Sequence, residues 1–227
     1  MSSTEFLDQA IIHLEEAVRL QPEKARYCVI LGEAFLLRGE PDAALPPLMA
    51  AFQTVKAPRT AWLLGLTLLI LDRFTEAREC GAEAIRGSES FDKALEIRAW
   101  ATFGTGQWSA AAEDFRSLVR KKEADTRSAL GLAACIGFQH LEGRSEADPM
   151  QISHWLDSQE RALLETRECR FLRSLADGRL TQPTAKTMEM QRMRFVRAAT
   201  RGLLHDLPGR VSRVTAFHLS SRGTESW

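Results

Sequence analysis

The stretch Cys28-Val-Ile-Leu-Gly-Glu-Ala-Phe35, followed by Gly39 and then by Ala44-Leu-Pro-Pro-Leu-Met-Ala-Ala51, decides the fold of this chain. Apolar residues recur at helical spacing on both sides of Gly39, which indicates two short helices joined by a tight turn. In the second helix a small residue is followed one turn later by a large apolar one. This combination predicts a close contact between the two helices.

The same pattern returns along the chain at intervals of 34, 33 and 34 residues. The small residue of each second helix is Ala10, Ala44, Ala77 or Ala111. Four residues further on stand Leu14, Leu48, Gly81 and Phe115, and seven further on stand Ala17, Ala51, Ala84 and Leu118. A period of this length predicts a solenoid, in which each helix pair buries its apolar faces against its neighbours.

The repeat resembles the tetratricopeptide repeat. The residues that carry the resemblance are Leu31, Gly32, Phe35, Gly39, Ala44, Leu48 and Ala51 in the first unit, Leu64, Gly65, Ala77 and Ala84 in the next, and Gly106, Trp108, Ala111 and Phe115 in the third. The aromatic residue typical of the fourth unit position is absent, because Cys28, Ala61, Leu95 and Ala129 stand there. The resemblance implies an all-α fold, a right-handed solenoid of helical hairpins with degenerate units.

The expected organisation has three parts. Residues 3–140 form the repeat domain: a single helix over 3–20, repeats over about 24–56, 58–90 and 91–124, and one further helix over about 125–140. Residues 150–207 form a C-terminal helical extension packed on or across the solenoid, with one long helix over 150–175 and another over 184–207. Residues 208–227 form a tail, in which 211–219 could make a short strand or a docked extension.

Composition bounds the function. The net charge is zero, which argues against nucleic acid as a partner. The first residues lack the basic region of a secretory signal. The most apolar run, Trp62 to Leu71, is about half a bilayer-spanning length, so we expect a buried helix and no membrane span.

No cofactor, metal or catalytic site is indicated by the sequence. The four cysteines at 28, 80, 135 and 169 have no CxxC spacing and fit core packing in a reduced, cytoplasmic setting. The five histidines show no HExxH or HxH spacing, and no phosphate-binding loop is present. We therefore expect a protein that is not an enzyme.

Charge is concentrated near the C-terminus. Between residues 183 and 213, Lys186 and six arginines stand against Glu189 and Asp206, which gives a net charge of +5. The segment is either a basic surface for an anionic partner or a terminal helix that packs its apolar side and turns its arginines outward. The shortage of aromatic residues in this segment argues against nucleic-acid stacking.

The repeat register also predicts a partner-binding groove. In tetratricopeptide repeats the first helices line a concave groove, and the resemblance places these residues in it: Arg26, Leu36, Arg59, Trp62, Leu66, Leu69, Lys93, Trp100, Phe103, Arg127 and Phe138. The second position of each unit is basic, namely Arg26, Arg59, Lys93 and Arg127, and most of the other groove positions are apolar. Because a solvated groove should not be this apolar, we expect something to cover it.

Two occupants of the groove remain open. In the first hypothesis, a peptide of a partner protein binds there through apolar anchors and carboxylates, and the protein acts as an adaptor or chaperone, as small cytoplasmic members of the family do. The alternative is a structural or oligomeric scaffold, whose groove is filled by its own C-terminal helices or by a second subunit.

Overall fold

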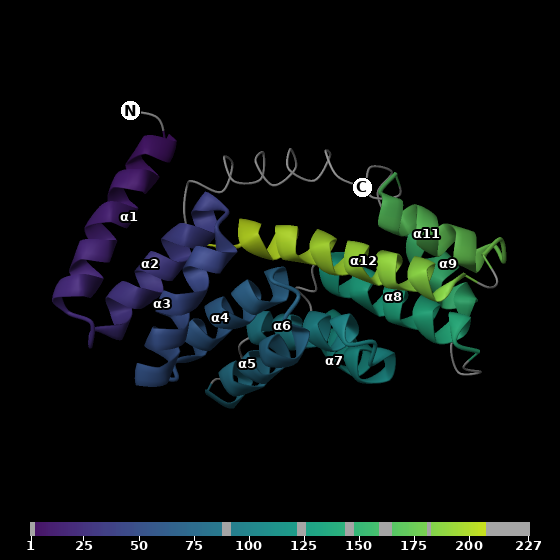
Figure 1. The fold of residues 1–227 in the computed structure, drawn as a ribbon. Helices are drawn as coiled ribbons and strands as arrows, with labels where there is room; N and C mark the ends of the chain where they lie inside the picture. Colours follow the sequence, from purple (N-terminus) through teal and green to yellow (C-terminus); the bar gives the residue numbers. More distant parts are fainter. Residues whose placement is uncertain are drawn as a thin grey trace. The chain divides into compact units, whose positions relative to one another are not determined.

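The structure, a computed structural model, describes residues 3–87, 92–121, 126–143, 148–158, 165–180 and 183–207. These residues form eleven α-helices and no strand (Figure 1). The helices are α1 (Ser3–Leu20), α2 (Ala25–Arg38), α3 (Pro41–Thr54), α4 (Pro58–Ile70), α5 (Phe74–Gly87), α6 (Asp92–Gly104), α7 (Trp108–Arg120), α8 (Thr126–Leu141), α9 (Pro149–Asp157), α11 (Arg167–Ala176) and α12 (Ala185–His205). The expected all-α architecture of consecutive helical hairpins is confirmed.

Contacts between Cα atoms divide the chain into two compact units. Unit 1 takes in residues 1–98 and 199–227, and unit 2 takes in residues 99–198. Both boundaries fall inside helices, one in α6 and one in α12. Each of these two helices therefore supplies residues to both units.

The helices of unit 1 from α1 to α5 pack in chain order, each against the next. Gly39 ends α2 in the left-handed conformation, with φ of 83°. Its N–H donates to the Leu36 carbonyl, and the Glu40 N–H donates to the Phe35 carbonyl. These two bonds satisfy carbonyls at the helix end and reverse the chain into α3. The turn expected at Gly39 is confirmed.

Glycines permit the close approach of neighbouring helices. A Cβ placed on Gly32 of α2 would lie 2.4 Å from Cγ of Leu48 in α3. In unit 2, a Cβ on Gly131 of α8 would lie 2.5 Å from the ring of Phe115 in α7. Both distances are too short for a real Cβ, so these contacts require glycine. The pairing of small and large residues expected from the sequence is confirmed at Gly32.

The C-terminal helices differ from expectation in one place. The single long helix predicted over residues 150–175 is wrong, because α9 ends at Asp157 and α11 begins at Arg167. The Thr166 hydroxyl accepts a hydrogen bond from the Cys169 N–H, and this N-cap starts a new helix. The helix predicted over 184–207 is confirmed as α12, whereas the possible strand over 211–219 lies outside the described residues.

All four cysteines are buried and free. They pack as small apolar residues, as expected, and burial raises the pKa of each thiol. The apolar run from Trp62 is the buried helix α4. Among the described residues, no helix has the length and apolar character needed to cross a membrane.

Candidate functional site

The predicted groove residues of unit 1 separate into a buried apolar set and an exposed basic set. Leu36, Trp62, Leu66 and Leu69 are all buried. Arg26 and Arg59 are exposed. Lys93 is half-buried. The apolar groove residues predicted in unit 1 are therefore part of its hydrophobic core.

Three of the four basic groove residues, Arg59, Lys93 and Arg127, interact with other residues of the chain. Arg59 forms an ion pair with Glu33 at 2.8 Å. The Lys93 ammonium donates to the Asp206 carbonyl at 3.2 Å and lies 5.0 Å from the centre of the Trp62 ring. Asp206 follows the last turn of α12, so Lys93 ties the end of that helix to α6 and α4 within unit 1. Arg127 of unit 2 also has a partner within the chain.

The aromatic groove residues predicted in unit 2 lie in a continuous cluster of aromatic rings. Its members, called the unit 2 aromatic cluster below, are Trp100, Phe103, Trp108, Phe115, Phe138, Phe171 and Phe195. Trp100, Phe103 and Phe138 are fully buried. Their side chains are therefore enclosed by the chain itself.

Phe195 of α12 covers the centre of this cluster. Its ring centroid lies 6.1 Å from that of Phe103, 6.2 Å from that of Phe138 and 6.1 Å from that of Phe171. All three contacts have the edge-to-face geometry that aromatic pairs prefer. Phe195 and the adjacent Val196 are both fully buried. The first part of α12 thus packs against aromatic residues of α6, α8 and α11 in unit 2.

This packing leaves some polar atoms without partners. Nε1 of Trp100, Oε1 of Gln191 and Nε of Arg192 are buried and make no hydrogen bond with the described residues. A buried polar group that makes no hydrogen bond costs about 1–3 kcal/mol. The three unpaired atoms therefore reduce the stability that the packing of α12 on unit 2 provides.

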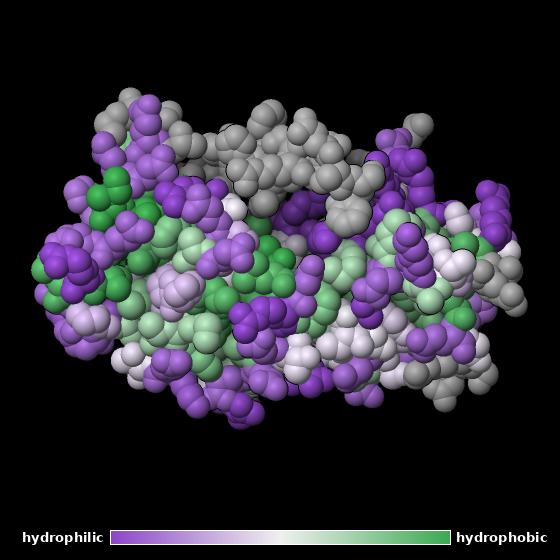
Figure 2. Space-filling view, viewed as in Figure 1, coloured by the Kyte–Doolittle hydropathy of each residue, from purple (hydrophilic) through white to green (hydrophobic). Residues whose placement is uncertain are grey.

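Helix α1 presents the opposite situation, a repeat face that no described helix covers. Ala44 and Ala51 of α3 are fully buried, whereas their counterparts Ala10 and Ala17 in α1 are exposed and half-buried. The large apolar residues Phe6, Ile12 and Leu20 are also exposed, and Figure 2 shows apolar atoms among hydrophilic ones on the side where α1 lies. The exposed fraction of the alanine at this repeat position therefore indicates whether a neighbouring helix packs against it.

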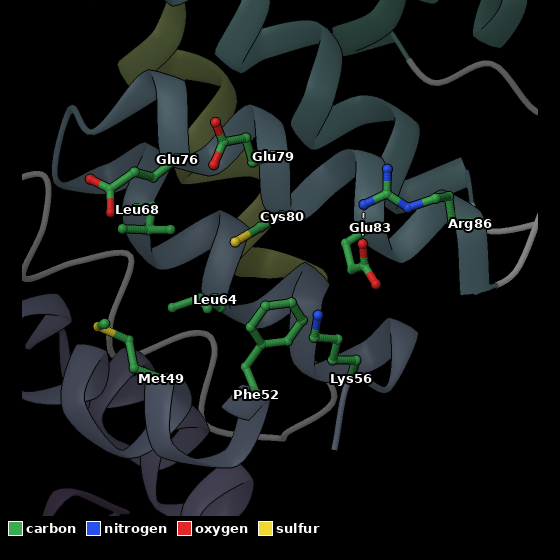
Figure 3. A pocket seen from close by; sticks show the side chains of 10 residues that line it. All are labelled: Met49, Phe52, Lys56, Leu64, Leu68, Glu76, Glu79, Cys80, Glu83 and Arg86. Atoms are coloured by element: carbon green, nitrogen blue, oxygen red, sulfur yellow. Dashed lines mark hydrogen bonds and ion pairs between the residues drawn. The ribbon is translucent and has the colours of Figure 1, made fainter. Parts of the chain in front are cut away.

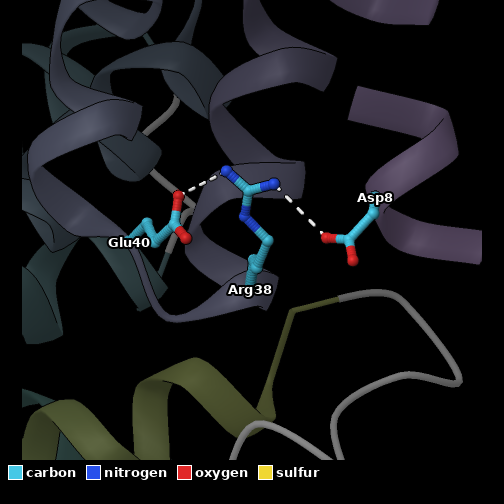
Figure 4. A network of polar contacts seen from close by, with 3 residues as sticks. All are labelled: Asp8, Arg38 and Glu40. Atoms are coloured by element: carbon cyan, nitrogen blue, oxygen red, sulfur yellow. Dashed lines mark hydrogen bonds and ion pairs between the residues drawn. The ribbon is translucent and has the colours of Figure 1, made fainter. Parts of the chain in front are cut away.

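A polar network fastens α1 to its neighbours (Figure 4). The Arg38 guanidinium donates to Asp8 of α1 at 3.3 Å and to Glu40 at 2.5 Å. Its carbon lies 5.2 Å from the centre of the Phe35 ring. The hydrogen bond to Glu40, with a smaller effect of Asp8, raises the pKa of Arg38. Ion pairs this exposed add little stability, so Ile11, which is buried, provides the main anchor of α1.

A cavity lies in unit 1 between α3 and α5 (Figure 3). The cavity has a volume of about 390 Å³. The lining residues are Met49, Phe52, Lys56, Leu64, Leu68, Glu76, Glu79, Cys80, Glu83 and Arg86. Two leucines of α4 and the thiol of α5 form an apolar floor, and the glutamates of α5 form one wall. We call this site the α3–α5 pocket.

The charges of the α3–α5 pocket are unevenly paired. Glu83 forms an ion pair with Arg86, and Glu76 forms one with Arg73. Glu79 is exposed and makes no ion pair with the described residues. Burial, assisted by the carboxylates of Glu76, Glu79 and Glu83, raises the pKa of Cys80 to about 11. The pocket therefore combines a protonated thiol and apolar carbons with an uncompensated carboxylate at its edge.

Comparison with known protein families supports the predicted helical repeats near the N-terminus of the chain. Residues 4–58, which span α1 to α3, match the family model described as Tetratricopeptide repeat. Residues 4–58 therefore form a tetratricopeptide-repeat segment. Repeats of this family generally mediate interactions between proteins. A search of curated proteins finds no match to the chain.

The α3–α5 pocket is a feature that the sequence did not predict. Glu76, Glu79 and Glu83 recur at spacings of three and four residues, which is a readable acidic stripe on one helix face. The stripe alone does not reveal a cavity, because the cavity depends on the gap between α3 and α5. Within the described part of the chain, no group of three histidine, cysteine or acidic side chains could hold a metal ion.

Proposed function

We propose that the protein is a non-enzymatic scaffold for protein partners whose inner repeat face is filled by its own helix α12. The observation that carries this proposal is the position of Phe195, fully buried among Phe103, Phe138 and Phe171. A phenylalanine buried in this way stabilises the folded state as a core residue does. Partners would then bind to surfaces that α12 leaves open.

Replacing Phe195 by serine tests this filling. Loss of a buried phenylalanine typically costs about 3–5 kcal/mol of unfolding free energy, and the serine adds an unpaired hydroxyl. Amides of α12 and α8 should then exchange their hydrogens much faster than in the wild type. Met190→Ser on the exposed side of α12 is the matched control and should change stability by less than about 0.5 kcal/mol. The proposal fails if both variants exchange alike.

A second candidate function is peptide capture in the groove, with α12 as a displaceable occupant. It is favoured by the buried, unpaired polar atoms of Trp100, Gln191 and Arg192, because a partner peptide could satisfy them better. This is the adaptor or chaperone function that the basic and aromatic groove columns predict.

The two candidates can be separated with a labelled synthetic peptide that copies residues 185–207. If α12 is displaceable, the peptide should bind saturably to the full chain and should make the resident α12 sensitive to protease. If α12 is a permanent part of unit 2, the peptide should bind only to Phe195→Ser, in which the resident helix is loosened. Binding to the wild type with displacement of α12 would overturn the scaffold proposal.

A further inference from the structure

We propose that the α3–α5 pocket binds a partner segment that presents a large apolar side chain next to a lysine or arginine. The proposal rests on the scaffold function above, because it gives that scaffold a surface for a partner that α12 does not occupy. The occupant is a protein segment, and its chemistry follows from the floor and the wall of the pocket.

The floor of the pocket selects an apolar side chain. The cavity of about 390 Å³ lies within the range of about 300–1,000 Å³ that is usual for ligand sites. Leu64 and Leu68 are buried in α4, and the Cys80 thiol is held in its neutral form. Met49 is 39% exposed at the edge, which is high for so apolar a side chain. An aliphatic or aromatic side chain entering here would bury this surface.

The wall of the pocket selects a positive charge beside that side chain. Three carboxylates and two cations line the cavity, so its formal charge is −1. The hydrogen bond from Arg86, with a smaller effect of the Lys56 charge, lowers the pKa of Glu83, and Arg86 forms an ion pair with that carboxylate. Glu79 lies apart from Arg86 and Lys56 in Figure 3 and makes no ion pair among the described residues. A lysine or arginine of the partner would pair with it.

The site is a built cavity, which distinguishes it from the exposed apolar face of α1. Met49 and Phe52 come from α3, the two leucines from α4, and the glutamates from α5. Three consecutive helices of one unit thus hold the apolar and charged groups in a fixed relation (Figure 3). Sites held on packed helices lose little freedom on binding, which favours recognition of one short segment.

Fluorescence anisotropy with a defined probe tests the assignment. The probe is an amidated peptide Gly-Ser-Leu-Leu-Lys-Ser-Gly with fluorescein at its N-terminus, titrated with the full chain. We expect saturable binding that weakens with added salt. Replacing the lysine of the probe by glutamate, or its leucines by serine, should weaken binding at least about fivefold, because each change removes one half of the recognition.

Variants of the protein locate the binding. Glu79→Lys should weaken binding of the lysine probe about five- to tenfold, because attraction is replaced by repulsion. Glu15→Lys makes the same change of charge on the exposed side of α1 and should leave binding unchanged. Met49→Ser should weaken binding about threefold or more, whereas Met190→Ser should not. Circular dichroism verifies that each variant keeps its helices.

Three results would overturn the pocket assignment. They are the absence of saturable binding at about 1 mM protein, equal binding of the lysine and glutamate probes, and equal effects of Glu79→Lys and Glu15→Lys. If the probe binds but responds to Phe195→Ser instead of Glu79→Lys, the inner face is the binding site and the scaffold proposal falls as well. If only the pocket assignment fails, the scaffold proposal is still tested by the hydrogen exchange of α12 in Phe195→Ser.

Discussion

Replacing Gly32 by alanine should destabilise the protein even though alanine is the better helix former. The new Cβ would lie 2.4 Å from Cγ of Leu48, 2.7 Å from its Cδ2 and 3.1 Å from its Cδ1. Leu48 is fully buried, so its branch point has no free space to move into. The intrinsic gain of alanine over glycine in a helix is about 1 kcal/mol, whereas overpacking costs about 1–3 kcal/mol. We expect a net loss of up to about 2 kcal/mol.

A double-mutant cycle separates the clash from the helix propensity. Leu48→Ala alone should cost about 2–5 kcal/mol, because it leaves a cavity between α2 and α3. In that background Gly32→Ala should become stabilising by about 1 kcal/mol, since the clash is gone and the new methyl group fills part of the cavity. The interaction free energy of the pair should therefore reach about 1–3 kcal/mol. Unfolding in urea, followed by far-ultraviolet circular dichroism, provides the measurement.

Gly137→Ala in α8 is the matched control. Its Cβ would meet Leu175 at 3.2 Å and Leu172 at 3.3 Å, so small shifts of those side-chain ends should suffice. This variant should therefore be more stable than Gly32→Ala by about 1–2 kcal/mol. If the effects of Gly32→Ala and Leu48→Ala add to within about 0.5 kcal/mol, the close packing of α2 on α3 is not the reason for the glycine.

Three further predictions concern other contacts. Lys93→Met should cost about 1 kcal/mol, through loss of the hydrogen bond to Asp206 and of the contact with the Trp62 ring, with a change in tryptophan fluorescence as the direct readout. Pro46→Ala in the interior of α3 should raise the midpoint of urea unfolding, because it restores a backbone donor; an unchanged midpoint would contradict this. Alkylation of Cys80 by iodoacetamide, mapped by mass spectrometry, should be slow at pH 8 and rise about tenfold per pH unit toward pH 11, since only the thiolate reacts.

The raised pKa of Cys80 also gives stability a pH dependence of known sign. Its folded pKa of about 11 exceeds the ordinary value of 9.0, so the folded state keeps a proton that the unfolded state releases. The resulting stabilisation is complete below about pH 9 and is lost as the pH rises toward 11. Cys80→Ala should lose less stability than the wild type over this interval in matched urea titrations. Parallel curves for the two proteins would contradict the assignment.

The sequence predicted the repeat architecture because its signals are local and recur in phase. Gly39 needs a left-handed conformation, and Gly32 and Leu48 fit together only if α2 and α3 pack closely. The end of α9 at Asp157 and the start of α11 at Arg167 were not predicted, since the apolar pattern does not mark the caps at Ser158 and Thr166.

Features formed by residues far apart in the sequence were harder to predict from the sequence. The aromatic columns indicated a covered face, but neither periodicity nor composition identifies Phe195 as the residue that enters it. The α3–α5 pocket was missed for the same reason, because its volume is the space left between helices whose side chains belong to three different segments.

Helix α1 helps to show why the inner face of unit 2 should be regarded as filled. Ala10 and Ala44 occupy the same repeat position, yet Ala10 is exposed and Ala44 is fully buried, because a helix packs on that face only in the second case. Exposure at a repeat position thus measures the presence of a neighbouring element. Phe103 and Phe138 would be exposed to solvent in an open groove, and both are fully buried. The Phe195 ring of α12, which packs against both, supplies the missing neighbour, so a partner that used these side chains would first have to remove Phe195.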